Sequence, residues 1–204
     1  MKYFCFEGPD YSGKTTIMNE VIRMLEELKI PFIETREPGS PYSIVCTRIR
    51  EILQHIEITD EMIYAGLYDI DRRIHLFEVV EKHLKKDLIV LSDRCIISSQ
   101  CYQEIKIKEL RDLNKEKFIS LNPFIFYIDI DKETVYERST LENMNSFEQN
   151  IFTSRIDNIF KNYKEIIPQY NNIVINNRTG TNVVENAKIV FNTILDLSGI
   201  KGDG

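Results

Sequence analysis

The sequence predicts an α/β protein with a five-stranded parallel sheet and helices on both faces of that sheet. Short apolar runs alternate along the chain with longer segments in which apolar residues recur at helical spacing. Such alternation implies right-handed crossovers, which make the strands parallel and bury both sheet faces. The 204 residues, 43% of them hydrophobic, can bury a core without a disulfide or a metal. We expect one domain over residues 1–200 and a frayed tail over residues 201–204.

The expected elements follow from these patterns in chain order. Runs of strand-forming residues predict strands at residues 2–6, 32–35, 88–91, 124–128 and 173–175. Helical spacing, such as that of Ile17, Val21 and Leu25, predicts the helices. They are expected at about residues 17–28, 41–55, 59–86, 96–118, 132–167 and 182–197. Pro41 suits the first turn of the second helix. Polar residues at 139–147 interrupt the long helical stretch.

Charge and composition narrow the class of protein. The net charge of −6 makes a broad surface for a nucleic acid polymer unexpected. No 18 apolar residues run together, and the chain turns polar and glycine-rich after six residues, so we expect neither a membrane span nor a signal peptide. The four cysteines are scattered without metal-ligand spacing, which fits reduced thiols in the cytoplasm. The histidines lack matching acids or nucleophiles, so we interpret as structural or solvated His55, His75 and His83.

Residues 8–15 match the phosphate-binding pattern GxxxxGK[ST], between the first expected strand and the first expected helix. Glycines let backbone N–H groups approach phosphate oxygens, and the following helix N-terminus adds partial positive charge. Lys14 is expected to reach the β- and γ-phosphates of a nucleoside triphosphate, and the Thr15 hydroxyl to bind Mg²⁺. The alternative is a structural turn with an incidental lysine. The residues predicted to bind this nucleotide are Gly8, Asp10, Tyr11, Ser12, Gly13, Lys14, Thr15 and Thr16.

The residues after the third expected strand indicate which kind of phosphate-binding protein this is. A GTPase normally carries an NKxD motif for guanine, and this sequence has none. A translocating ATPase carries two acidic residues at the end of this strand, where this chain has Asp93 followed by Arg94. An arginine in that position suits an enzyme that holds a second anionic phosphate beside the Mg²⁺ site. The pattern therefore favours a nucleotide kinase over a GTPase or a motor.

Four segments resemble motifs of the thymidylate (dTMP) kinases. Residues 6–16 resemble the FEGxDxxGKTT loop of that family, and residues 35–39 its TREPG segment. Residues 67–72 resemble its LFxxDR helix, and residues 93–103 its DRYxxSxxAYQ segment. The second half of the chain is similar in element order and, weakly, at residues 152–155. The resemblance implies a P-loop kinase core, ATP and Mg²⁺ as donor and cofactor, dTMP as acceptor, and a homodimer formed through the helices around residues 41–86.

The same resemblance implies a phosphate clamp on the acceptor side. Arg94 would hold the dTMP phosphate bidentately, and Arg36 would hold it from the opposite side. Asp93 would position Mg²⁺, and Asp10 would accept a hydrogen bond from the sugar 3′-hydroxyl. The Glu37–Pro38 peptide bond is expected to be cis, as it often is in the family. The plain alternatives are a solvated Arg36, a local cap at Asp10, and an Asp93 that only pairs with Arg94.

A base pocket is implied in the same way. Tyr68 would lie against the thymine face, and Arg72 would bind its O4 oxygen. Ser98 or Ser99 would contact the edge of the base, and Tyr102 would crowd the sugar 2′ position and disfavour a ribonucleotide. The alternatives are tyrosines of a helix core and serines that merely start a helix. Because the family prefers Phe where Tyr68 lies, and Tyr or His where Cys95 lies, relaxed base selectivity is left open.

The catalytic arginine is where the chain departs from the family. Members carry it in the P-loop or in the lid, and Tyr11 occupies the P-loop position here. The resemblance implies a small lid segment around residues 137–149, which holds only Arg138, so either Arg138 acts alone, Arg155 swings in, or the enzyme is slow. Adenine is expected between the lid and the loop after the fifth strand. Arg178 and Thr179 are candidates there, with ordinary surface-loop residues as the alternative.

Two other functions compete with a dTMP kinase. A deoxynucleoside kinase needs a carboxylate to accept the 5′-hydroxyl proton, and Glu34 or Glu37 could supply one. The phosphate-clamping Arg36 in the TREPG-like segment counts against that function. A nucleotide-binding degenerate kinase without turnover would fit the scarcity of lid arginines. Intact Lys14 and Arg94 oppose it.

Overall fold

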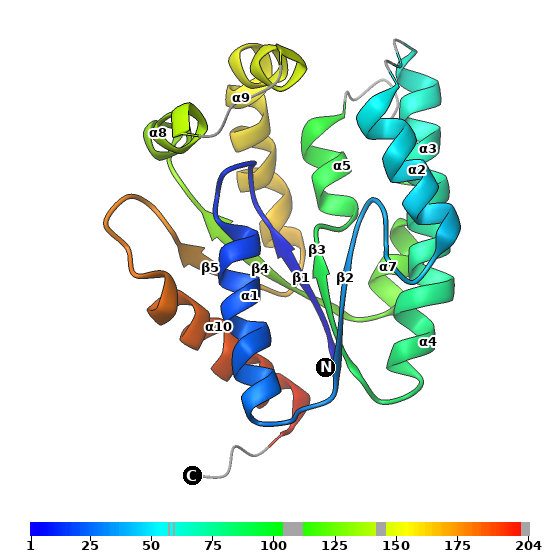
Figure 1. Ribbon diagram of the computed structural model, residues 1–204, viewed down its shortest axis with the longest axis vertical. Helices are drawn as coiled ribbons and strands as arrows, with labels where there is room; N and C mark the ends of the chain where they lie inside the picture. The colour runs from blue at the N-terminus through cyan, green and yellow to red at the C-terminus, as the bar shows by residue number, and fades with distance from the viewer. Residues whose placement is uncertain (57, 59, 104–111, 142–145, 201–204) are drawn as a thin grey trace.

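The computed structural model describes residues 1–56, 58, 60–103, 112–141 and 146–200. Its sheet has five parallel strands in the order β2-β3-β1-β4-β5 (Figure 1). The strands are β1 Tyr3–Glu7, β2 Phe32–Arg36, β3 Ile89–Asp93, β4 Pro123–Asp129 and β5 Asn172–Asn176. The predicted fold class is confirmed, and each strand lies within two residues of its expected bounds.

Helices connect the strands and cover both faces of the sheet (Figure 1). The helices of the first half are α1 Lys14–Glu27, α2 Ile44–His55, α3 Glu61–Ile74, α4 Glu81–Leu84 and α5 Ile96–Tyr102. Those of the second half are α7 Lys115–Ser120, α8 Lys132–Leu141, α9 Ser146–Ile166 and α10 Val183–Ser198. A π-helical segment, His75–Val80, joins α3 to α4, and a short 3₁₀ segment, Ile167–Gln169, follows α9.

Three expected helices differ from the structure. The helix expected at 41–55 begins at Ile44, because the Ser43 side chain accepts a hydrogen bond from the Cys46 N–H and caps the helix there. The single helix expected at 59–86 is three consecutive segments, with its π-helical part beginning at the buried His75. The helix expected at 96–118 is two helices, since α5 ends at Tyr102. Residues 104–111 between them lie outside the described residues.

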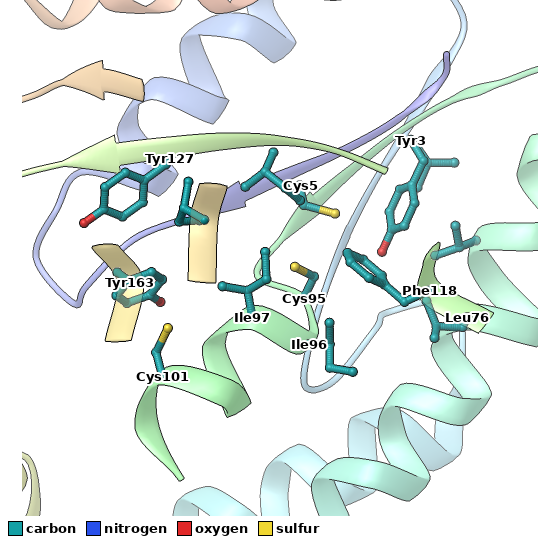
Figure 2. Packing of buried hydrophobic residues seen from close by; sticks show 14 of the residues in the cluster. Tyr3, Cys5, Leu76, Cys95, Ile96, Ile97, Cys101, Phe118, Tyr127 and Tyr163 are labelled. Carbon is teal, nitrogen blue, oxygen red and sulfur yellow. The ribbon is translucent and has the colours of Figure 1, made fainter. Parts of the chain in front are cut away.

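Alternation along β1 shows how the sheet divides the core. Tyr3 and Cys5 point to one face, and Phe4 and Phe6 point to the other, all with no exposed surface. The first face is covered by the π-helical segment, α5 and α9, and Figure 2 shows part of that packing. The second face is covered by α1 and α10. The central strand β1 is therefore packed between two apolar layers.

Register brings the functional strand ends together. Phe6 of β1 and Arg36 of β2 both pair with Asp93 of β3, so these three strands end at one edge of the sheet. In open parallel sheets, ligands bind outside the carboxyl ends of the strands. The loops that follow β1, β2 and β3 carry most of the predicted site residues, and the fold gathers them at that edge.

Two further expectations concern covalent and membrane features. All four cysteines, Cys5, Cys46, Cys95 and Cys101, are buried and free, as predicted. Among the described residues, no helix is both long and apolar enough to cross a bilayer.

Candidate active site

The phosphate-binding loop turns sharply between β1 and α1. Gly8 and Gly13 adopt φ angles of 150° and 84°, where a side chain is disfavoured. A Cβ on Gly8 would lie 2.7 Å from the Ile128 carbonyl oxygen, and one on Gly13 would lie 2.5 Å from Asn177 Nδ2. The backbone can adopt this path because both positions lack a side chain. Thr15 and Thr16 are exposed in the first turn of α1, where a phosphate-bound cation would be accessible.

Lys14 is buried inside the loop that it belongs to. Its Nζ donates to the carbonyl oxygens of Gly8 and Pro9, at 2.9 and 2.7 Å. Burial, followed by repulsion from Arg94, lowers the pKa of Lys14 to about 8. The ammonium is therefore mostly protonated at neutral pH, and a phosphate oxygen would be a stronger partner than either carbonyl.

Asp93 and Arg94 stand at the end of β3, as expected. Arg94 has a φ of 70°, an uncommon conformation for a residue with a side chain, and such strain is concentrated at functional sites. Its guanidinium donates to Asp10 Oδ1 and to Ser98 Oγ. Asp93 Oδ1 is buried and has no hydrogen-bond partner among the described residues. An unpaired carboxylate oxygen beside a phosphate loop fits a role in holding hydrated Mg²⁺.

The structure adds an arginine that the sequence analysis missed. Arg36 Nε donates to Gly39 O at 3.2 Å, and Arg50 Nη1 donates to Pro38 O at 2.9 Å. Burial, followed by Arg36, lowers the pKa of Arg50, and the charges of Asp93 and Arg94 also act on it. Arg50 therefore lies against Pro38 and Gly39, in the loop that follows β2. It comes from α2, and the only local signal was the glycine of residues 35–39, which leaves room for the Arg50 stem.

Asp10 joins the phosphate-binding loop to Arg94 and Tyr102. Its Oδ2 accepts from Tyr102 OH at 3.1 Å, and the Arg94 guanidinium lies 5.6 Å from the centre of the Tyr102 ring. Burial alone would raise the pKa of Asp10, but Arg94 and Lys14 together lower it below its ordinary value. Asp10 therefore stays ionised and able to accept a further hydrogen bond. The structure brings together all three residues predicted here, Asp10, Arg94 and Tyr102.

The residues predicted for a base pocket separate into two groups. Arg72 is fully buried, where its Nε donates to Glu37 Oε1 at 2.5 Å and its Nη2 donates to Ser99 Oγ at 2.6 Å. Ser98 instead lies on the phosphate side, between Arg94 and Glu7. Ser99 is therefore the serine that accompanies Arg72. The Glu37–Pro38 bond is cis, as expected.

Tyr68, which was predicted for the base pocket, lies on α3, and Gln103, which was not, follows α5. The Tyr68 hydroxyl lies 3.3 Å from that of Tyr64, one helical turn away on α3. Gln103, at the end of α5, carries a buried side-chain oxygen without a partner among the described residues. It is the last residue of the segment 93–103, but the sequence analysis gave it no role. Buried polar atoms are nearly always paired, so this oxygen points to a ligand contact.

Arg138, the candidate of the lid region, contacts the phosphate loop directly. Its Nη1 donates to Tyr11 O at 3.0 Å, and its Nη2 donates to Asn177 O at 2.9 Å. Arg155 lies elsewhere, with its Nη2 3.8 Å from Glu61 Oε1 at the start of α3. The part of the expected lid at 142–145 lies outside the described residues. Of the two arginines, Arg138 is therefore the one that lies beside the phosphate-binding loop.

Arg178 and Thr179, in the loop after β5, contact different acidic residues. Arg178 is half exposed and donates to Asp129 Oδ2 at 2.9 Å, and Thr179 Oγ1 donates to Glu137 at 2.9 Å. Asn177 was missed by the sequence analysis. It is buried, and its Nδ2 donates to Ser12 O at 2.7 Å, so it fixes the phosphate loop from the side of β5. No sequence motif marks it, because the contact spans most of the chain.

Glu7 is another residue to which the sequence alone assigned no role. Its Oε1 accepts from the N–H groups of Cys95 and Ser98, at 2.8 and 3.2 Å. Its Oε2 accepts from Ser98 Oγ at 2.8 Å and from Tyr163 OH at 3.0 Å. This buried carboxylate joins the end of β1 to the start of α5 and to α9. It therefore sets the spacing between the phosphate loop and Arg94.

A loop that binds phosphate, facing arginines that end or follow neighbouring strands, is the arrangement of a P-loop nucleotide kinase, in which two anionic substrates meet. The family model described as thymidylate kinase matches residues 6–187. A thymidylate kinase of Finegoldia magna is 35% identical over 184 residues, which cover 85% of this chain and 88% of the relative. One of Ureaplasma parvum serovar 3 is 32% identical over 180 residues, covering 83% and 77%.

Structural comparison agrees on the fold. The crystal structure of thymidylate kinase from Ehrlichia chaffeensis aligns with a TM-score of 0.69 at 23% identity, over 95% of this chain and 97% of that one. The chain belongs to the thymidylate kinase family.

Proposed function

We propose that this protein transfers the γ-phosphoryl group of ATP to dTMP, giving ADP and dTDP. The observation that carries the proposal is the group of Arg36, Arg50 and Arg94 around the ends of β2 and β3, at the same sheet edge as the phosphate-binding loop that holds the Lys14 ammonium. Positive charge on both sides of the transferred group offsets the repulsion between the two anionic substrates. Membership of the family supports dTMP as the acceptor.

The proposed reaction needs little covalent help from the protein. An anionic oxygen of the dTMP phosphate attacks the γ-phosphorus, the new P–O bond forms, and the bond to the β,γ-bridging oxygen breaks. No general base is required, because the attacking oxygen already carries negative charge near pH 7. Lys14 and the loop N–H groups hold the donor, and Arg94 and Arg36 hold the acceptor in line with it.

Mg²⁺ fits the residues at the junction of these two halves. We propose that the Thr15 hydroxyl and the Asp93 carboxylate hold it, together with water and phosphate oxygens. No group of three or more metal-ligating side chains occurs among the described residues, which agrees with a cation that keeps most of its water. When bound, the ion would neutralise the charge that develops on the β- and γ-phosphate oxygens.

Base selection would rest on the pocket beside Arg72. We propose that Tyr68 stacks on thymine and that Arg72, Ser99 and Gln103 bind its polar edge. Because Arg72 is already oriented by Glu37, it can offer a guanidinium proton to the base at a fixed position. Tyr102, held by Asp10, would leave little room for a 2′-hydroxyl.

Arg138 is the proposed catalytic arginine, since it is the arginine that bonds to the phosphate loop from the lid side. Its contacts with Tyr11 O and Asn177 O would aim the guanidinium at the donor phosphates. Arg178 is proposed to line the adenine side, although its contacts with Asp129 and Asp131 support that role only by location.

The competing deoxynucleoside kinase function is poorly supported. Glu34 is exposed on the edge strand β2, and Glu37 is buried between Arg72 and His75. Glu37 is therefore engaged by these two partners, and Glu34 lies within β2, two residues before the end of the strand, so neither is placed to accept a proton from a 5′-hydroxyl. A degenerate kinase is not favoured either, because the Lys14 ammonium lies in the phosphate-binding loop and the Arg94 guanidinium contacts Asp10 of that loop.

The finer assembly is also a proposal. Large apolar side chains lie exposed on α2 and α3, namely Ile44, Val45, Met62, Ile63 and Ile70. A second copy would cover them, and we propose a homodimer through these helices. We further propose a single domain over residues 1–200 with a lid around residues 137–149, a cytoplasmic location, and no nucleic acid or membrane partner.

An ADP-release assay with ATP and Mg²⁺ tests the proposed function. It compares dTMP, dUMP, dGMP, dCMP and thymidine at equal concentration. We expect dTMP to give the highest turnover. Similar turnover with several monophosphates would replace thymine selectivity by a broader kinase. Turnover with thymidine alone would favour a nucleoside kinase, and nucleotide binding without turnover would favour a degenerate one.

A further inference from the structure

Tyr163 is a buried tyrosine of α9, distant in sequence from every motif of the site. Its ring stacks on that of Tyr127, with centroids 5.4 Å apart and an interplanar angle of 27° (Figure 2). Its hydroxyl lies 3.0 Å from Glu7 Oε2 and 3.1 Å from the Gly8 carbonyl oxygen. Burial, followed by the charge of Glu7, raises the pKa of Tyr163, so this hydroxyl remains a donor.

The Gly8 carbonyl oxygen is shared by two donors. Lys14 Nζ donates to this oxygen at 2.9 Å, and the oxygen of the Tyr163 hydroxyl lies 3.1 Å from it. A buried carbonyl left without a donor is unfavourable. When Lys14 turns toward a phosphate oxygen, the Gly8 oxygen therefore needs another donor, and Tyr163 is in place.

The Tyr163 hydroxyl can turn away from Glu7, because Glu7 has other hydrogen-bond donors. Its Oε2 also accepts from Ser98 Oγ at 2.8 Å and from the Gly8 N–H at 3.3 Å. The single hydroxyl proton of Tyr163 can therefore rotate from Glu7 to the Gly8 oxygen without leaving the carboxylate unpaired.

We propose that Tyr163 is a positioning residue for Lys14: its hydroxyl keeps the Gly8 carbonyl paired when the lysine turns to bind the donor phosphates. The inference deepens the proposed function, on which it rests, by tying the helix that follows the lid to the donor loop. It predicts that loss of the hydroxyl weakens ATP binding only when Lys14 is present.

A double-mutant cycle tests this coupling, with affinity for a non-hydrolysable ATP analogue and Mg²⁺ measured by calorimetry. Tyr163→Phe alone is expected to weaken binding roughly tenfold, a factor that corresponds to one lost hydrogen bond. In the Lys14→Ala background, Tyr163→Phe is expected to change the affinity less than twofold, because no lysine leaves the Gly8 oxygen. The matched control is Tyr127→Phe, since the Tyr127 hydroxyl is buried without a partner among the described residues.

The outcomes separate this inference from the proposed function. An equal loss from Tyr163→Phe in both lysine backgrounds would indicate a merely structural tyrosine and overturn the inference. So would an unchanged affinity in the native background, or a loss as large for Tyr127→Phe. These results would leave the acceptor assay unaffected. Failure of the unmodified protein to bind the analogue at all would overturn both.

Discussion

Single residues in this protein carry charge in places where charge is costly. Arg72 and Glu37 have side chains exposed by only 1% and 2%, and they are joined at 2.5 Å. Burial alone would raise the pKa of Glu37, but Arg72 and His75 lower it below its ordinary value. The pair is thus stable as a unit, while either partner alone would be a buried, uncompensated ion. The pair also orients the guanidinium that we assign to the base.

Removing one partner should therefore be more damaging than removing both. Arg72→Met is expected to lower the free energy of unfolding by about 3–5 kcal/mol, because Glu37 is left buried with His75 as its remaining partner. The double variant Arg72→Met with Glu37→Leu should recover most of that loss. Urea unfolding monitored by circular dichroism measures both. A double variant no more stable than the single one would contradict this interpretation.

Asp71 predicts a pH dependence of stability. Its Oδ1 accepts from the Gly39 N–H at 3.0 Å, while its Oδ2 is buried without a partner among the described residues. Burial, followed by the charge of Glu37, raises the pKa of Asp71 to about 6. The unfolded chain releases this proton near pH ~3.9, so between these values the folded state binds more protons. The free energy of unfolding therefore falls as pH rises through this window.

Asp71→Asn removes that penalty. The variant should exceed the native protein in free energy of unfolding by about 2 kcal/mol at pH 7.5, and the difference should vanish below pH ~4. Urea unfolding at several pH values measures it, with Asp196→Asn as an exposed control on α10. A constant difference at all pH values would show that titration of Asp71 is not the cause.

Much of the residue-level site could be predicted from the sequence, but not all. Asp93 ends β3, Arg94 follows it, and Lys14 follows the phosphate-binding loop after β1, so their place at the sheet edge is set by local sequence. Arg50 and Asn177 belong to elements whose approach to the loop is set by packing of the whole sheet. No local pattern distinguishes them from ordinary helix or loop residues.

At the scale of elements, α8 serves the site through its last turn. Arg138 bridges two carbonyl oxygens, Tyr11 O and Asn177 O, and so joins the phosphate loop to the loop after β5. A guanidinium can donate to both at once in a fixed plane, whereas a lysine ammonium cannot reproduce that geometry. The position of this helix in the chain could be predicted from the sequence. The contact of Arg138 with both carbonyl oxygens could not, because it depends on where the loop after β5 lies.

The conservative variant tests the bridge. Arg138→Lys is expected to reduce kcat/KM for ATP by roughly 10- to 100-fold, because charge is kept while the planar contact is lost. Steady-state kinetics with saturating dTMP measures it. The control is Arg23→Lys on the exposed surface of α1. Activity of the Arg138 variant within threefold of the native protein would exclude the bridge as a functional contact.

The ends of helices are where the structure differs from the bounds that apolar spacing predicts. Apolar spacing continues from residue 59 to residue 86, but the helix changes to a π-helical form at His75. Ring nitrogens of His75 lie 3.0 Å from Thr35 Oγ1 and 3.4 Å from Glu37 Oε2, contacts with the end of β2 and the residue after it. A tertiary contact of this kind has no counterpart in local periodicity. The N-cap at Ser43, by contrast, is a local feature that could have been read in place of Pro41.

For the whole molecule, the exposed apolar residues of α2 and α3 predict a dimer. Ile63 is 60% exposed, and a glutamate there would be buried and unpaired in a dimer interface. Ile63→Glu should raise the dimer dissociation constant at least ~10-fold, as measured by light scattering over a dilution series. Ile189→Glu on α10, 48% exposed in the native protein, is the matched control. Equal effects of the two variants, or a monomeric native protein, would contradict the proposed interface.

In the proposed function, the donor and the acceptor bind to different groups at one edge of the sheet, and two variants test this division most directly. MgATP affinity by calorimetry and turnover with dTMP are measured for Arg94→Ala and Lys14→Ala. Arg94→Ala should lose at least ~10³-fold in turnover while its ATP affinity stays within threefold, because the acceptor clamp is lost. Lys14→Ala should weaken ATP binding itself. Equal loss of ATP affinity in both variants would contradict the assignment of Arg94 to the acceptor.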